Sequence, residues 1–159
     1  ISTLLEARAD PSLGDFSRGH APIHMAADGR SGGAKALAMM LEAGANSQAA
    51  RTSDGCMPIH RACHRNGFDA LEVLLAAAAD PNATMSDGAS AMHVAAFYNC
   101  SAVLKRLLDA RADVDKATSG EGIGMFGQHA RSMQTAALEG RKNQGAHPIH
   151  SAVAGGRLG

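Results

Sequence analysis

Apolar residues recur along the chain in short bursts with helical spacing. In one burst, over 69–75, Leu71, Leu74 and Leu75 fall on one stripe of a helix, and a second burst over 101–108 has the same character. Each burst is followed by small residues and then by polar residues that are typical of turns. The pattern therefore predicts several short amphipathic helices separated by turns.

Two sequence blocks recur with a common period. The first reads G-x-x-[P/A]-[I/M]-H and occupies 19–24, 55–60, 88–93 and 145–150, so its first two intervals are similar and its third is much longer. The second block reads L-x-A-x-A-[D/N] and ends at nearly even intervals, at Asp10, Asn46, Asp80 and Asp113. Two independent blocks that share a period of about 33 residues indicate a repeat array.

Each repeat is predicted to contain two helices and a hairpin. Pro22, Pro58 and Pro148 suit the first position of a helix, where a missing N–H has no cost. Asn66 and Asn99 tolerate the positive φ that ends a first helix. The apolar bursts supply the second helix, and the polar residues after them an extended hairpin.

These segments resemble the ankyrin repeat, whose signature is G-x-T-P-L-H-x-A-A, a Gly, a V-x-x-L-L helix and G-A-D-x-N. The family's glycine after the second helix is present only as Gly44, and Arg8, Ala78 and Arg111 replace it elsewhere. A left-handed conformation would cost such residues about 1 kcal/mol, so we expect these turns to be adjusted.

The resemblance implies an all-α ankyrin-repeat solenoid of helix-turn-helix units with projecting β-hairpin loops. It divides the chain into a half repeat at 1–15, repeats at 19–51, 55–84 and 88–115, an insertion at 116–144 and a half repeat at 145–159. We interpret the insertion as an elaborated hairpin with one helix, or alternatively as a degenerate repeat without its second helix. Neither end carries the polar cap that terminal repeats need, so we expect a longer natural chain or docked ends.

Composition excludes several classes of function. Fifteen basic residues balance fifteen acidic ones without a basic stripe, which argues against a nucleic-acid partner. No apolar run approaches the roughly 18 residues of a membrane span, so we expect no direct membrane insertion. The three cysteines show no C-x-x-C spacing and suggest reduced thiols in an intracellular reducing compartment, which could be cytoplasm, nucleus or an organelle matrix.

Histidines and carboxylates offer no catalytic or metal site. The family resemblance implies that His24, His60, His93 and His150 each tie a helix start to the adjoining hairpin backbone. No H-E-x-x-H motif or paired C-x-x-C accompanies them, so we expect no metal and no cofactor. The aspartates of the second block suit solvated turns. No Ser-His-Asp or Cys-His arrangement is visible, and we expect the chain not to be an enzyme.

The resemblance implies that another protein binds along the concave face and the hairpin tips. Mapped onto this sequence, the contact positions are His20, Asp28, Cys56, His64, Arg65, Phe97 and Tyr98. The adjacent aromatic residues Phe97 and Tyr98 are candidate anchors, or they pack against the insertion. The predicted function is a protein–protein interaction or scaffolding module. Alternatives are a regulatory ankyrin segment of a larger enzyme or channel, and a structural subunit of a large multi-subunit assembly.

Overall fold

The computed structural model describes residues 2–15, 19–28, 32–117 and 149 of the chain. Within this part the secondary structure is helical, without a strand, which confirms the predicted all-α class. In chain order the helices are α1 (Ser2–Glu6), α2 (Pro22–Ala27), α3 (Gly33–Glu42), α4 (Pro58–His64), α5 (Phe68–Ala76), α6 (Ala91–Phe97) and α7 (Ser101–Asp109).

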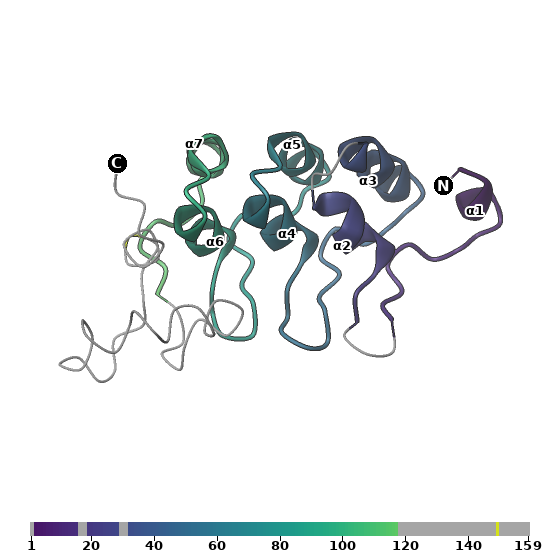
Figure 1. Cartoon of the computed structure of the whole chain (residues 1–159), viewed down its shortest axis with the longest axis horizontal. Coiled ribbons are helices and arrows are strands. Elements are labelled where there is room, and N and C mark those ends of the chain that lie inside the picture. Colours follow the sequence, from purple (N-terminus) through teal and green to yellow (C-terminus); the bar gives the residue numbers. More distant parts are fainter. Residues whose placement is uncertain (1, 16–18, 29–31, 118–148, 150–159) are drawn as a thin grey trace.

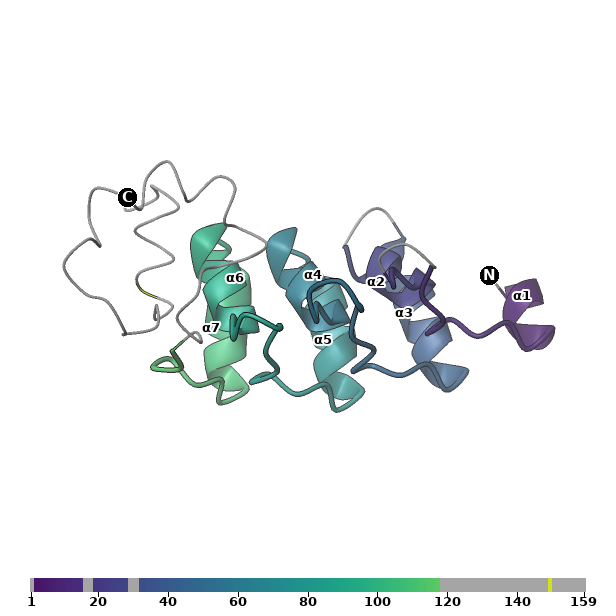
Figure 2. The ribbon, with the colours of Figure 1, turned by 90° about the horizontal axis from the view of Figure 1, so that it is seen from below.

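The helices from α2 to α7 form two rows (Figure 1). The inner row contains α2, α4 and α6, the outer row contains α3, α5 and α7, and the connecting loops project from the inner row. The same stacking is visible from below, where each inner helix lies beside its outer partner (Figure 2). All of these helices are far short of the length and apolar character that a bilayer span requires.

Local sequence determines where the inner helices begin and end. Pro22 and Pro58 are the first residues of α2 and α4, as predicted. Asn66 and Asn99 have φ values of 55° and 54°, which confirms the predicted left-handed turns after α4 and α6. Each asparagine therefore lets the chain reverse from an inner helix into its outer partner.

The turns after α1 and after the outer helices keep the left-handed conformation even without glycine. Gly44 has a φ of 90°, and Arg8, Ala78 and Arg111 have φ values of 59°, 57° and 62°. The expectation that these turns would be adjusted is therefore wrong. After α5, the Ala79 N–H donates to the carbonyl of Leu74 at 2.9 Å, so the left-handed turn satisfies a carbonyl at the helix end.

The core lies between the two rows of helices. Leu71 and Leu74 of α5 and Val103 and Leu107 of α7 are fully buried, which confirms these parts of the two predicted stripes. Leu108 is 49% exposed, so the apolar stripe of α7 is narrower than the sequence indicates. Leu108 follows the buried Leu107 directly, so its side chain points about 100° further around the helix, away from the core.

Short polar side chains stabilise the turns that follow the outer helices. Four of them accept the backbone N–H two residues ahead at 2.8 to 2.9 Å, which confirms the turn role predicted for the aspartates: Asp10, Asn46, Asp80 and Asp113. Neighbouring turns are also connected, because the Asp113 N–H donates to Oδ1 of Asn82 at 2.7 Å.

The hairpin loops stack on one another without forming strands. The Ser86 N–H donates to the carbonyl of Asp54 in the preceding hairpin at 3.0 Å. Among the described residues, an isolated bridge between Thr84 and Ser90 is the sole β-pairing. Gly55 has a φ of 69°, and a Cβ at this position would lie 2.8 Å from the Ser86 nitrogen. Neighbouring hairpins thus approach too closely for a side chain at Gly55.

Two predicted segments fall mostly outside the described residues. The structure describes the predicted insertion at 116–144 only as far as 117, and the predicted half repeat at 145–159 only at Ile149, which is exposed. The residues of the candidate interaction surface lie within 19–28 and 32–117.

Candidate interaction surface

The buried histidines His24 and His60 each bind the start of their own helix through Nδ1 and the following repeat through Nε2. His60 Nδ1 accepts the N–H of Met57 at 3.1 Å, and its Nε2 lies 3.1 Å from the carbonyl of Ala83. Because Nδ1 accepts, Nε2 carries the proton and donates it to Ala83. His24 makes the same pair of contacts, to the N–H of Ala21 and the carbonyl of Cys56. The predicted structural role of His24 and His60 is confirmed.

Burial keeps these imidazoles neutral. His60 is fully buried, and burial lowers its pKa to about 4. Burial also lowers the pKa of His24.

The third repeat histidine, His93, places Nδ1 2.8 Å from the hydroxyl oxygen of Ser90, at the start of α6. Within the described part of the chain, no three of the histidine, cysteine and acidic side chains gather as metal ligands.

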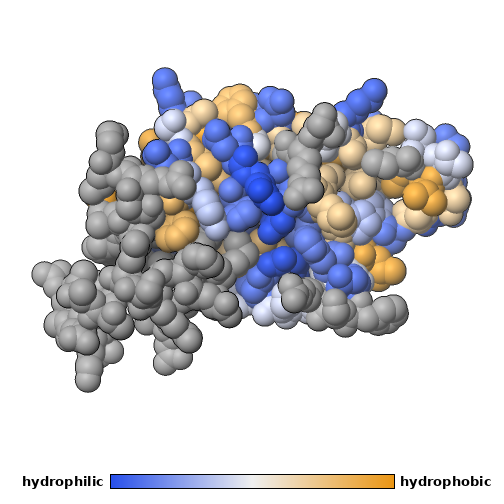
Figure 3. Space-filling view, viewed as in Figure 1, coloured by the Kyte–Doolittle hydropathy of each residue, from blue (hydrophilic) through white to orange (hydrophobic). Residues whose placement is uncertain are grey.

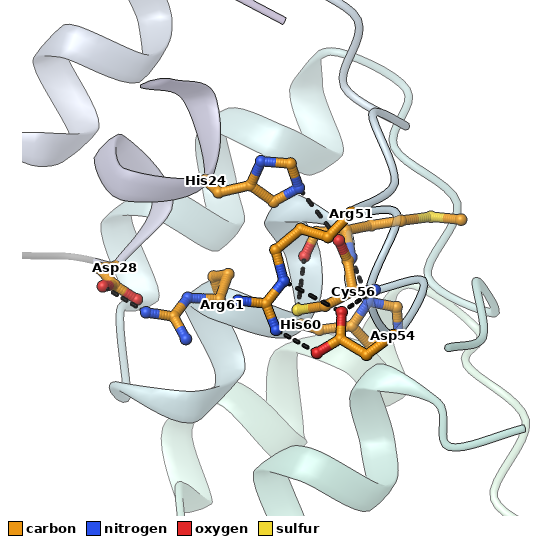
Figure 4. A network of polar contacts seen from close by, with 8 residues as sticks. His24, Asp28, Arg51, Asp54, Cys56, His60 and Arg61 are labelled. Carbon is orange, nitrogen blue, oxygen red and sulfur yellow. Dashed lines mark hydrogen bonds and ion pairs between the residues drawn. The ribbon is translucent and has the colours of Figure 1, made fainter. Parts of the chain in front are cut away.

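An ion pair joins the end of α2 to the middle of α4. Arg61 Nη2 donates to Asp28 Oδ2 at 2.6 Å, and both side chains are almost buried. Figure 4 shows Arg61 extending toward Asp28, while Arg51 pairs with Asp54 in the hairpin. One arginine thus connects two inner helices, and the other stabilises the loop beside them.

Aromatic rings lie next to this ion pair. The ring centroids of His64 and Tyr98 are 4.4 Å apart at an interplanar angle of 80°, an edge-to-face contact. Phe97 and Tyr98 form a second edge-to-face contact, with centroids 5.1 Å apart. Burial lowers the pKa of His64, and Arg61 and Arg65 lower it further. All three rings are half-buried and therefore retain accessible surface.

A model of ankyrin repeats in three copies matches residues 23–118, more than half of the chain. This chain belongs to the ankyrin-repeat family. Ankyrin repeats generally serve as protein–protein interaction modules, and the family is typically non-catalytic. No curated protein matches the chain.

Most of the predicted ankyrin contact positions lie together in space. Arg61 lies at the centre of a group that we call the Arg61 cluster, made of Asp28, Arg61, His64, Arg65 and Tyr98. His20 lies beside this cluster, because Arg61 and Asp28 both influence its pKa, which burial lowers. Hydrophilic residues gather in a band over α4 on the face seen in Figure 3. The predicted positions His20, Asp28, His64, Arg65, Phe97 and Tyr98 thus lie close to one another around the inner helices.

Cys56 is an exception among the predicted contact positions. It is fully buried, and burial raises the pKa of its thiol to about 12. Its carbonyl accepts a hydrogen bond from His24, which holds the base of the hairpin against α2. The prediction that Cys56 lines the contact surface is therefore wrong. Cys63 and Cys100 are also free and buried.

Sequence reasoning missed the central residue of the cluster. Arg61 was not a predicted contact position, and Asp28 was predicted to face a partner, whereas only 9% of Asp28 is exposed and it binds Arg61. The available signal was the pair of opposite charges at 28 and 61, which lie one repeat apart in the sequence.

Proposed function

We propose that this chain is a protein-interaction module that binds its partner along the ends of the inner helices and the adjoining hairpins. The observation that carries the proposal is the row of half-buried rings of His64, Tyr98 and Phe97 beside the exposed Arg65. Aromatic and arginine side chains are enriched among the residues that dominate binding energy at interfaces. The proposed partner is another protein.

Ring packing favours this surface as an interface. The edge-to-face contacts of Tyr98 with His64 and Phe97 restrict its ring in the free chain. A side chain that is already ordered loses less conformational entropy when a partner binds. The surface also spans α4 and α6, so one partner segment could contact two repeats.

The three buried thiols support a reducing intracellular compartment for this interaction.

Partner capture with the full chain and mass spectrometry tests the proposal. Proteins captured by the wild-type chain should be lost with Tyr98→Ala and retained with Phe68→Ala. Phe68 is 41% exposed and begins α5 in the outer row, so it is a matched aromatic control. For a purified partner, Tyr98→Ala should weaken affinity about 30-fold, or about 2 kcal/mol.

The melting temperature of each variant completes this test. Tyr98→Ala should change stability less than affinity, because the Tyr98 ring packs at the edge of the core and is not fully buried within it. If stability collapses while the affinity per folded molecule is unchanged, Tyr98 is a packing residue and the proposed surface is incorrect.

A further inference from the structure

We propose that the partner inserts an aspartate or glutamate side chain between Arg61 and Arg65, beside His64. This inference rests on the proposed function, because it specifies which chemistry the same surface recognises. It follows from three properties of the Arg61 cluster: buried nitrogen atoms without partners, an excess of positive charge, and an acceptor next to those nitrogens.

The cluster contains buried nitrogen atoms that the described residues do not satisfy. Arg61 uses Nη2 for its bond to Asp28, but its Nε is buried and has no hydrogen-bond partner there. His64 Nδ1 is also buried and finds no partner in the part of the chain that the structure describes. A buried unpaired donor costs about 1–3 kcal/mol, so such atoms are uncommon unless a ligand or water satisfies them. The Nε–H of arginine can only donate, and a ligand atom here must therefore accept.

The positive charge of the Arg61 cluster favours an anion as the group that accepts from Nε of Arg61. Asp28 neutralises Arg61, whereas Arg65 is exposed and makes no ion pair within the described residues. The excess at this end of α4 is therefore one positive charge. Arg61 and Arg65 both lower the pKa of His64, and both oppose the rise that burial causes in the pKa of Tyr98. A carboxylate would accept from Nε of Arg61 and pair with Arg65 in a partly dehydrated setting.

The neighbouring acceptor favours a peptide over a bare anion or a phosphate group. Asp28 Oδ1 is buried and has no hydrogen-bond partner among the described residues. This oxygen would repel a doubly charged phosphate more strongly than a singly charged carboxylate, and a backbone N–H next to a partner's carboxylate would donate to it. An aspartate or glutamate within a peptide supplies both the acceptor and the donor.

A phage-displayed library of random peptides, selected on the full chain, tests the inference. We expect the enriched peptides to share an aspartate or glutamate at one fixed position. A synthetic peptide from this set should bind at least tenfold more weakly after Asp→Asn or Glu→Gln at that position. It should show a similar loss on the Arg65→Ala chain. Lys105→Ala, which removes an exposed charge on α7, should leave the affinity unchanged.

Charge exchange gives the sharpest version of this test. Arg65→Glu should lose the acidic peptide, and a lysine at the same peptide position should recover only part of the binding, because Nε of Arg61 still lacks an acceptor. Arg65 is exposed, so these variants should keep the wild-type melting temperature.

The other outcomes separate this inference from the proposed function. Peptides that depend on Tyr98 but show no acidic preference would overturn the inference and leave the proposed surface intact. Peptides that are insensitive to both Tyr98→Ala and Arg65→Ala, or a selection that enriches none, would contradict both.

Discussion

Single residues hold neighbouring repeats together. His60 extends from the first turn of α4 to a backbone carbonyl in the hairpin that follows α5. At its other ring nitrogen it satisfies the N–H of Met57, one of the donors that a helix start leaves unpaired. One imidazole thus fixes both a helix start and a repeat boundary, and the neutral ring is the form that can do so.

Removal of this ring should destabilise the fold. We predict that His60→Ala lowers the free energy of unfolding by about 1–3 kcal/mol, because two buried backbone groups lose their partner. His93→Ala should act in the same direction. His64→Ala is the control, because His64 lies on the same helix but is half-buried, and its Nδ1 makes no bond to the residues that the structure describes. Urea denaturation measures the effect, and equal losses for His60→Ala and His64→Ala would contradict it.

Acid should weaken the same contacts. An imidazole in the unfolded chain binds a proton near pH 6.5, whereas the pKa of His60 in the folded chain is about 4. The unfolded chain binds more protons between these values, so stability falls as the pH decreases through this window. The loss from His60 should reach about 3 kcal/mol near pH 4, and the lowered pKa of His24 adds to it.

The pH dependence of unfolding in a matched variant isolates this contribution. His60→Gln lacks a titrating ring, so between about pH 7 and about pH 5 it should lose less stability than the wild-type chain. Identical slopes for the two proteins would show that His60 does not titrate in the way we expect.

At the scale of elements, the hairpins are packed more tightly than the helix ends. Gly55 and Gly44 both have positive φ, but a Cβ at Gly55 meets the next hairpin and a Cβ at Gly44 meets open space. We predict that Gly44→Ala costs about 1 kcal/mol from backbone conformation alone. Gly55→Ala should cost about 2 kcal/mol or more, since the neighbouring hairpin must also move. Comparable unfolding midpoints for the two variants would contradict this view of hairpin stacking.

The outer-helix ends retain a strain that glycine should relieve. Ala78 has a φ of 57°, whereas the preceding Ala77 has a φ of −85°. We predict that Ala78→Gly raises stability by up to about 1 kcal/mol, because release of the left-handed strain exceeds the added flexibility of the unfolded chain. Ala77→Gly should instead lower stability by about 0.5–1 kcal/mol. Thermal unfolding of the pair checks both signs, and a lower melting temperature for Ala78→Gly would refute the prediction.

At the scale of the whole molecule, the period of the sequence predicted most of the fold. Prolines at helix starts, asparagines after inner helices and the buried histidines are local features that recur with each repeat, so one sequence can reveal them. Burial of Cys56, exposure of Leu108 and the Asp28–Arg61 pair depend on how one repeat lies against the next. The spacing places opposite charges at 28 and 61 one repeat apart, but it does not show which such pairs meet when the repeats stack, and this explains why the centre of the candidate surface was missed.

Some bonds across repeat boundaries allow any repeat to follow another, whereas others require a particular neighbour. The histidine contacts end on backbone carbonyls, which every repeat possesses, so they would survive duplication or exchange of repeats. The Asp28–Arg61 pair instead requires complementary side chains on two successive units. Repeats could therefore be copied or reordered with their histidine contacts intact, whereas a new neighbour without an arginine at the position of Arg61 would leave Asp28 buried and uncompensated. This pair therefore fixes the order of the first and second full repeats, as the Glu72–Arg106 pair does for the second and third.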